Sequence, residues 1–108
     1  MANLLKETET ILNRYNKTID DILYIADRET KVYITPKEFV KRARNINYNS
    51  GYGLVEINLN LIAVGKNFWL ERHEYDGSEW WEYKEIPTIA DFVIEDKNTN
   101  RKCYLKER

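Results

Sequence analysis

Hydrophobic and polar positions follow two different periods along the chain. From Asn3 to Tyr15 the apolar residues recur at helical spacing and form one stripe, made of Leu4, Leu5, Ile11, Leu12 and Tyr15. This predicts an amphipathic helix that ends near Asn16. A short apolar run at 22–25 and an alternating run at 31–35 then flank four polar residues, which predicts a β-hairpin.

A second helix has a clear start signal. Thr35 has the side chain of an N-cap, Pro36 suits the first helical position, and Glu38 completes a capping box. We expect this helix to run to about Ile46, with its basic residues on one face: Lys37, Lys41 and Arg44.

The rest of the chain has β character. Residues 47–53 are rich in Asn, Ser and Gly and predict a loop, and an alternating strand is expected over 55–64. The runs 68–75 and 78–86 are joined by Asp76-Gly77, a pair that suits a tight primed turn. A last strand pair is expected at 91–95 and 102–105. The order predicts one α+β domain over 1–108, in which an antiparallel β-meander of four to five strands packs against the helices.

The register of the predicted 68–86 hairpin decides which side chains face outward. With a two-residue turn, His73 lies opposite Trp80 and Glu71 opposite Glu82, and the other face carries Phe68, Leu70, Arg72, Trp81 and Tyr83. A three-residue bulged turn would exchange Trp80 with Trp81. The sequence leaves both registers open.

Composition narrows the function classes. The 108 residues are 43% hydrophobic and 32% charged, with a net charge of −1, which argues against a general coat for nucleic acid. The single cysteine forms no internal disulfide, and there is no long apolar run. We therefore expect a cytoplasmic protein without a membrane segment. No cofactor-binding motif is found, and no cofactor is expected.

Two candidate chemical sites follow from residue types. Glu71, His73 and Glu82 share one face in the first register, where two carboxylates and an imidazole suit a divalent metal or an acid–base site. Cys103 lies in a strand-like context without a nucleophile turn. We assign no catalytic residue and expect a protein that is not an enzyme, with a metal-binding module or metal-dependent enzyme as the alternative.

Charge is unevenly distributed along the chain. Residues 71–96 hold nine acidic against two basic side chains. An acidic surface interleaved with aromatic rings suits docking onto a basic groove of a protein partner. The expected partner-binding residues are Trp69, Glu71, His73, Glu74, Tyr75, Asp76, Glu79, Trp80 and Glu82. A further alternative is a nucleic-acid-binding domain that uses Lys37, Lys41 and Arg44.

The segment from Trp69 to Glu82, preceded by Gly51-Tyr52-Gly53, resembles small uncharacterised proteins of phages and prophages of Gram-positive bacteria. The resemblance covers between a third and a half of the chain and transfers no catalytic residue. By association it implies the class of inhibitors of host defence, including anti-CRISPR proteins. The partner implied is a host defence nuclease complex in the host cytoplasm.

Overall fold

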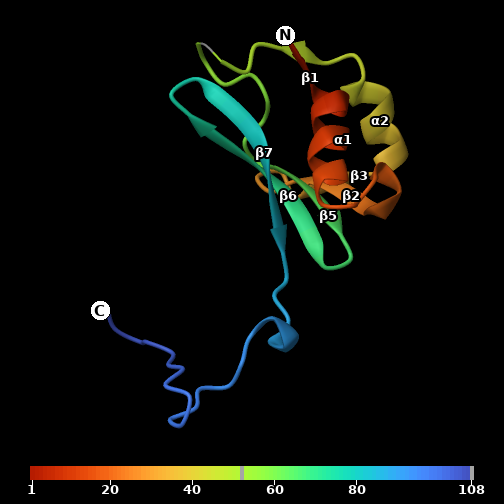
Figure 1. Ribbon diagram of the computed structural model, residues 1–108. Helices are drawn as coiled ribbons and strands as arrows, with labels where there is room; N and C mark the ends of the chain where they lie inside the picture. Colours follow the sequence, from red (N-terminus) through yellow and green to blue (C-terminus); the bar gives the residue numbers. More distant parts are fainter. Residues whose placement is uncertain (52, 108) are drawn as a thin grey trace.

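Two α-helices cover one face of an antiparallel β-sheet in the computed structural model, which describes residues 1–51 and 53–107 (Figure 1). Within these residues the sheet has five strands in the order β3-β2-β5-β6-β7. A separate small sheet pairs β1 (Ala2–Asn3) with β4 (Asn47–Tyr48). The predicted α+β class, with an N-terminal helix and a later meander, is confirmed.

Both helices begin where the sequence predicts. Helix α1 (Leu4–Arg14) is capped by Asn3, whose side chain accepts a hydrogen bond from the Lys6 amide. Helix α2 (Pro36–Ala43) starts with Pro36 after the N-cap Thr35, whose hydroxyl accepts from the Glu38 amide. These bonds satisfy amide groups that a helix start leaves without partners. Helix α2 ends three residues earlier than predicted.

The first hairpin joins the same sheet as the later strands. Strands β2 (Ile22–Asp27) and β3 (Val32–Ile34) pair as predicted, after a short 3₁₀ turn η1 (Ile19–Asp21). Strand β2 then pairs with β5 (Leu61–Gly65), which leads into β6 (Phe68–Tyr75) and β7 (Ser78–Glu85). Of the five strands, β5, β6 and β7 therefore form the meander, and β2 and β3 form the first hairpin.

Two expected strand regions differ from the structure. The predicted strand over 55–64 begins only at Leu61, because Asn58 closes a turn by accepting bonds from the Asn60 and Leu61 amides. The predicted strands 91–95 and 102–105 do not form; a single bridge joins Asp96 and Arg101, in the segment between them. In the predicted 47–53 loop, two residues form β4, and Tyr52 lies outside the described residues.

The core lies between the helices and the sheet. It combines residues from both helices, both sheets and the loop before β5: Leu4, Leu12, Ile22, Ile25, Phe39, Ala43, Tyr48, Ile57, Ala63, Phe68, Leu70 and Trp81. Alternation along each strand directs these side chains to the helix side and the intervening ones to the opposite side. The opposite side of the sheet, which no helix covers, is called the outer sheet face (Figure 1).

The chain leaves this body after β7. Residues 86–107, called the arm, run away from the sheet and contain the 3₁₀ turn η2 (Ile89–Asp91) (Figure 1). The arm extends the molecule to 57 Å in one direction and raises the radius of gyration to 17.7 Å. A compact chain of this length has a radius of about 13 Å. No helix in the described residues combines the length and the apolar character needed to cross a membrane.

Candidate functional site: the outer face of the β6–β7 hairpin

The turn of the β6–β7 hairpin decides which tryptophan is exposed. Asp76 and Gly77 have φ values of 49° and 88°, the left-handed conformation that a two-residue primed turn requires. Tyr75 pairs with Ser78 and His73 with Trp80, so the first register is correct. Trp80 is 38% exposed on the outer sheet face, whereas Trp81 is 3% exposed and belongs to the core.

The outer sheet face continues from this hairpin across the neighbouring strands. Trp69 lies between Val64 of β5 and Lys84 of β7, and Glu71 lies between Ile62 and Glu82. Farther along the same face, the rings of Tyr24 and Tyr33 meet edge to face, with centroids 5.8 Å apart. The sequence did not predict this continuation, since it gave no sign that β2 pairs with β5. The alternation of Tyr24 with Ile25 and of Tyr33 with Ile34 indicated only that the two tyrosines lie on the face opposite the isoleucines.

His73 lies between the carboxylates of Glu71 and Glu82 on this face. Its Nδ1 atom is 3.3 Å from a Glu82 oxygen, and its Nε2 atom is 3.5 Å from a Glu71 oxygen. The imidazole also stacks against Trp80, with ring centroids 6.4 Å apart. The predicted grouping of Glu71, His73 and Glu82 is therefore present.

The carboxylates of Glu71 and Glu82 also have basic partners. Lys84 Nζ is 3.1 Å from Glu82, and Arg28 Nη1 is 3.6 Å from Glu71. The hydrogen bond between Lys84 and Glu82 lowers the pKa of Glu82. The same bond raises the pKa of Lys84. Two acids thus face two bases, and this part of the surface is not strongly acidic. The expectation of one acidic, ring-bearing face is wrong here.

The arrangement around His73 does not suit a metal ion. A metal binds one imidazole nitrogen and needs its carboxylate ligands on that same side. Here the two carboxylates approach different ring nitrogens. Among residues 1–51 and 53–107, no group of three or more His, Cys, Asp or Glu side chains is placed to hold a metal.

Glu79 was expected on the contact surface, and this prediction is wrong. The residue is 3% exposed, and its carboxylate accepts hydrogen bonds from the amides of Glu56 and Ile57. It also forms an ion pair with Arg72. Glu79 pairs with Glu74 near the turn, on the helix side of the hairpin, where the loop before β5 covers it.

Arg72 organises the polar contacts beneath the hairpin. Its guanidinium bonds to Glu7 on α1, to Glu79 and to the Tyr48 hydroxyl. The guanidinium also lies over two aromatic rings. Its Cζ atom is 5.0 Å from the ring centroid of Trp81 and 5.7 Å from that of Tyr48. A buried cation needs such partners, because an unpaired charge in the interior is very costly.

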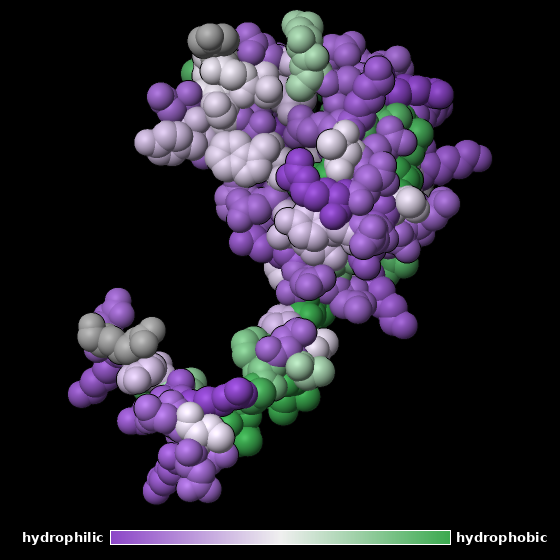
Figure 2. Space-filling view, viewed as in Figure 1, coloured by the Kyte–Doolittle hydropathy of each residue, from purple (hydrophilic) through white to green (hydrophobic). Residues whose placement is uncertain are grey.

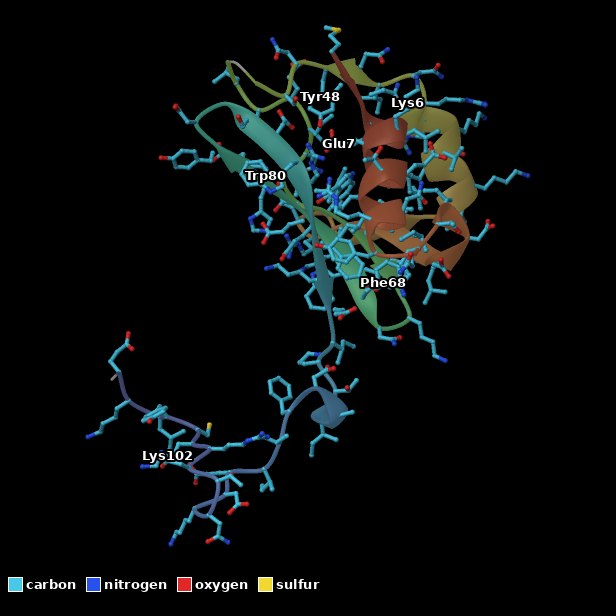
Figure 3. The ribbon with its side chains drawn as sticks, in the orientation of Figure 1. Lys6, Glu7, Tyr48, Phe68, Trp80 and Lys102 are labelled. Carbon is cyan, nitrogen blue, oxygen red and sulfur yellow. The ribbon has the colours of Figure 1, made fainter. Side chains whose placement is uncertain are left out.

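Two more contacts fasten helix α1, one to Tyr48 of β4 and one to Trp81 of the hairpin. The Tyr48 hydroxyl donates to Glu7, which lies beside it between α1 and the hairpin (Figure 3). Burial and this bond raise the pKa of Tyr48 to about 12. The indole of Trp81 donates to Thr8 at 2.8 Å. Figure 3 shows Trp80 on the opposite side of the hairpin from α1.

The expected contact residues other than Glu79 are partly or fully accessible on the outer sheet face or near the turn, with Glu74 exposed on the helix side opposite Glu79. They are the hairpin surface: Trp69, Glu71, His73, Glu74, Tyr75, Asp76, Trp80 and Glu82. Tyr75 is 76% exposed at the turn, and Glu74 and Asp76 are exposed beside it. The remaining acidic residues of the stretch lie elsewhere, on the end of β7 and on the arm: Glu85, Asp91, Glu95 and Asp96.

The basic residues of α2 share a face, as predicted. Lys37, Lys41 and Arg44 are exposed and line one shallow groove together with Thr35, Val40 and the carboxylate-bearing Glu38. None of the three forms an ion pair with a carboxylate in the part of the chain that the structure describes. This groove belongs to the helix layer, opposite the outer sheet face. Cys103 is exposed on the arm.

Comparison with known proteins adds no relative to this description. The chain matches no family model, and no curated protein or solved structure is significantly similar to it.

Proposed function

We propose that this protein is a non-enzymatic binding protein that inhibits a nucleic-acid-handling protein of a bacterial host, such as a defence nuclease, through its hairpin surface. The observation that carries the proposal is the position of Trp69 and Trp80 on a sheet face that no helix covers. Trp80 is exposed and Trp69 is half-buried, and partly exposed tryptophans are typical anchors of protein interfaces.

The paired charges of the hairpin surface also favour binding. Each carboxylate near His73 already has a basic partner, so little charge is left unpaired when this surface is covered. An interface core with few unpaired charges avoids the cost of removing them from water.

The turn of the hairpin carries the net negative charge that the surface around His73 lacks. Glu74 and Asp76 are exposed on either side of Tyr75. Exposed carboxylates at the rim of an interface speed association with a basic surface. A groove that normally holds nucleic acid has this basic character.

The test is a DNA-cleavage assay with purified CRISPR effector nucleases of Gram-positive bacteria. We expect the wild-type protein to slow cleavage by at least one of them. The double variant E74K/D76K and the single variant W80A should each weaken binding, measured by biolayer interferometry. The matched control E9K/D20K reverses two exposed charges on the helix side and should bind like the wild type.

Two results would reject this function. One is the absence of both inhibition and binding across the set of nucleases. The other is inhibition that persists unchanged in E74K/D76K and in W80A, because the hairpin surface would then not be the contact surface.

The α2 groove favours a second candidate function, contact with nucleic acid through Lys37, Lys41 and Arg44. The three cations form no ion pair among the described residues and can meet phosphates, although Glu38 in the same groove lowers the local positive charge. If all three cations contact phosphates, the logarithm of the association constant for duplex DNA should fall with the logarithm of the salt concentration at a slope of about −2.7.

Fluorescence anisotropy with a labelled duplex tests this second function. K41E should weaken binding and flatten the salt dependence, whereas K66E, which changes an exposed lysine in the β5–β6 turn, should have little effect. No binding at low salt would reject this candidate.

A further inference from the structure

The first half of the arm exposes a row of apolar side chains. Ile89 and Ile94 are 92% and 88% exposed, and Ile86, Phe92 and Val93 are all more than half exposed. Figure 2 shows the apolar surface gathered along this part of the arm, outside the body. Apolar side chains that cluster on an exposed segment mark a binding surface.

The body carries an apolar groove at the β2–β3 hairpin. Its walls include Leu23, Val32 and Tyr33, which are each more than 60% exposed, together with Tyr24 and Ile62. Arg28 and Lys31 lie on the rim. The groove therefore combines an apolar floor with two basic side chains.

The arm and the groove are complementary in charge. The apolar run of the arm contains Asp91 and ends in Glu95 and Asp96. Acidic side chains around an apolar segment suit a groove whose lining includes Lys31 and Arg28, although Arg28 also pairs with Glu71, so Lys31 is the cation without an ion pair among the described residues. The carboxylate of Asp27, which also lines the groove, is taken up by Asn58 and by the amides of Glu29 and Thr30.

We propose that residues 86–96 of one copy of this protein occupy the β2–β3 groove of a second copy. The arm extends away from the body that carries its own groove, which leaves it accessible to another molecule (Figure 1). Exchange of the same segment between two copies gives a closed two-fold dimer in which each groove receives one arm. The contact includes none of the eight residues of the hairpin surface.

Analytical ultracentrifugation of the full chain over a concentration series tests this exchange. We expect a dimer for the wild type. The arm variant F92D/I94D and the groove variant V32E/Y33E should each raise the dimer dissociation constant by about 30-fold or more. The controls Y75E and L105D also place a charge on an exposed side chain, outside both residues 86–96 and the groove, and should remain dimeric.

A mixing experiment separates exchange from any other dimer. The arm variant keeps an intact groove, and the groove variant keeps an intact arm. Mixed together, they should form a heterodimer with one arm–groove contact, although each alone is a monomer. Circular dichroism of both variants checks that the substitutions, all at exposed positions, leave the fold intact.

Three outcomes would overturn the proposal. The first is a wild-type monomer at every concentration; if hydrogen exchange then shows protected arm amides, the arm occupies the groove of its own chain. The second is a dimer that neither double variant weakens. The third is a pair of monomeric variants that fail to associate when mixed.

Discussion

Arg72 and Glu79 form an ion pair 3.1 Å long in which neither side chain is exposed to solvent. The pair joins β6 to β7 on the helix side, and Glu79 directly precedes the exposed Trp80. The outer face of the hairpin is therefore supported from below by a charged contact and not by apolar packing alone. Several expected outcomes depend on this arrangement.

Removal of Glu79 should destabilise the protein severely. The variant E79A leaves Arg72 with one carboxylate fewer and leaves the amides of Glu56 and Ile57 without their acceptor. Breaking a buried ion pair costs about 3–5 kcal/mol. Urea unfolding followed by tryptophan fluorescence measures the loss. E74A, on the facing strand position, should change stability by about 0.5 kcal/mol or less. A similar stability for both variants would contradict this account.

Stability should fall at alkaline pH because of Tyr48. Its folded-state pKa of about 12 exceeds the ordinary value of 10.0, so the folded state holds the phenol proton more tightly than the unfolded chain does. The stabilisation is complete below pH 10 and is lost as the pH rises through 12. Urea unfolding at several pH values should show a smaller alkaline loss in Y48F than in the wild type. Y75F, at the exposed turn, is the control, and equal slopes in wild type and Y48F would refute the assignment.

The contact between Thr8 and Trp81 should be measurable by itself. T8V keeps the side-chain shape but removes the acceptor of the indole N–H, which is buried in the core. An unsatisfied buried donor costs about 1–3 kcal/mol. A double-mutant cycle with W81F isolates the contact, because the phenyl ring needs no acceptor. Additive losses in the cycle would mean that this hydrogen bond contributes no coupling.

Gly65 is required by the ring of Phe68. A Cβ atom at position 65 would lie 2.1 to 2.7 Å from three atoms of that ring, which is closer than atoms can approach. The ring also stacks on Tyr83 and lies under Lys17, so its movement disturbs other contacts. G65A should therefore cost about 1–3 kcal/mol by thermal or urea unfolding. G51A, where the nearest atom is 3.8 Å away, is the matched control.

Local signals explain why much of the fold was predictable. Thr35-Pro36 begins a helix and Asp76-Gly77 closes a hairpin because each pair restricts its own backbone. Once the turn has two residues, the register and the exposure of Trp80 follow. These features depend on residues close together in sequence.

The failures involve partners that are distant in sequence. Glu79 resembles its exposed acidic neighbours until the backbone of residues 56–57 covers it. Arg72 was correctly placed on the apolar side of the strand, yet its partner Glu7 is 65 residues away. An arginine among core positions indicates that a carboxylate must lie beside it. It does not indicate which residue of the chain provides that carboxylate. The run 91–95 reads as a strand, and in the described residues no strand pairs with it.

The hydrogen bond between Trp81 and Thr8 spans 73 residues, and this separation matters during synthesis. At about 5–20 residues per second, the ribosome makes Trp81 roughly 4 to 15 s after Thr8. Helix α1 therefore emerges long before the hairpin that covers it, and short helices are marginal in water without packing. The N-terminal segment must wait, incompletely folded, for the second half of the chain, and a chaperone has its opportunity in that interval.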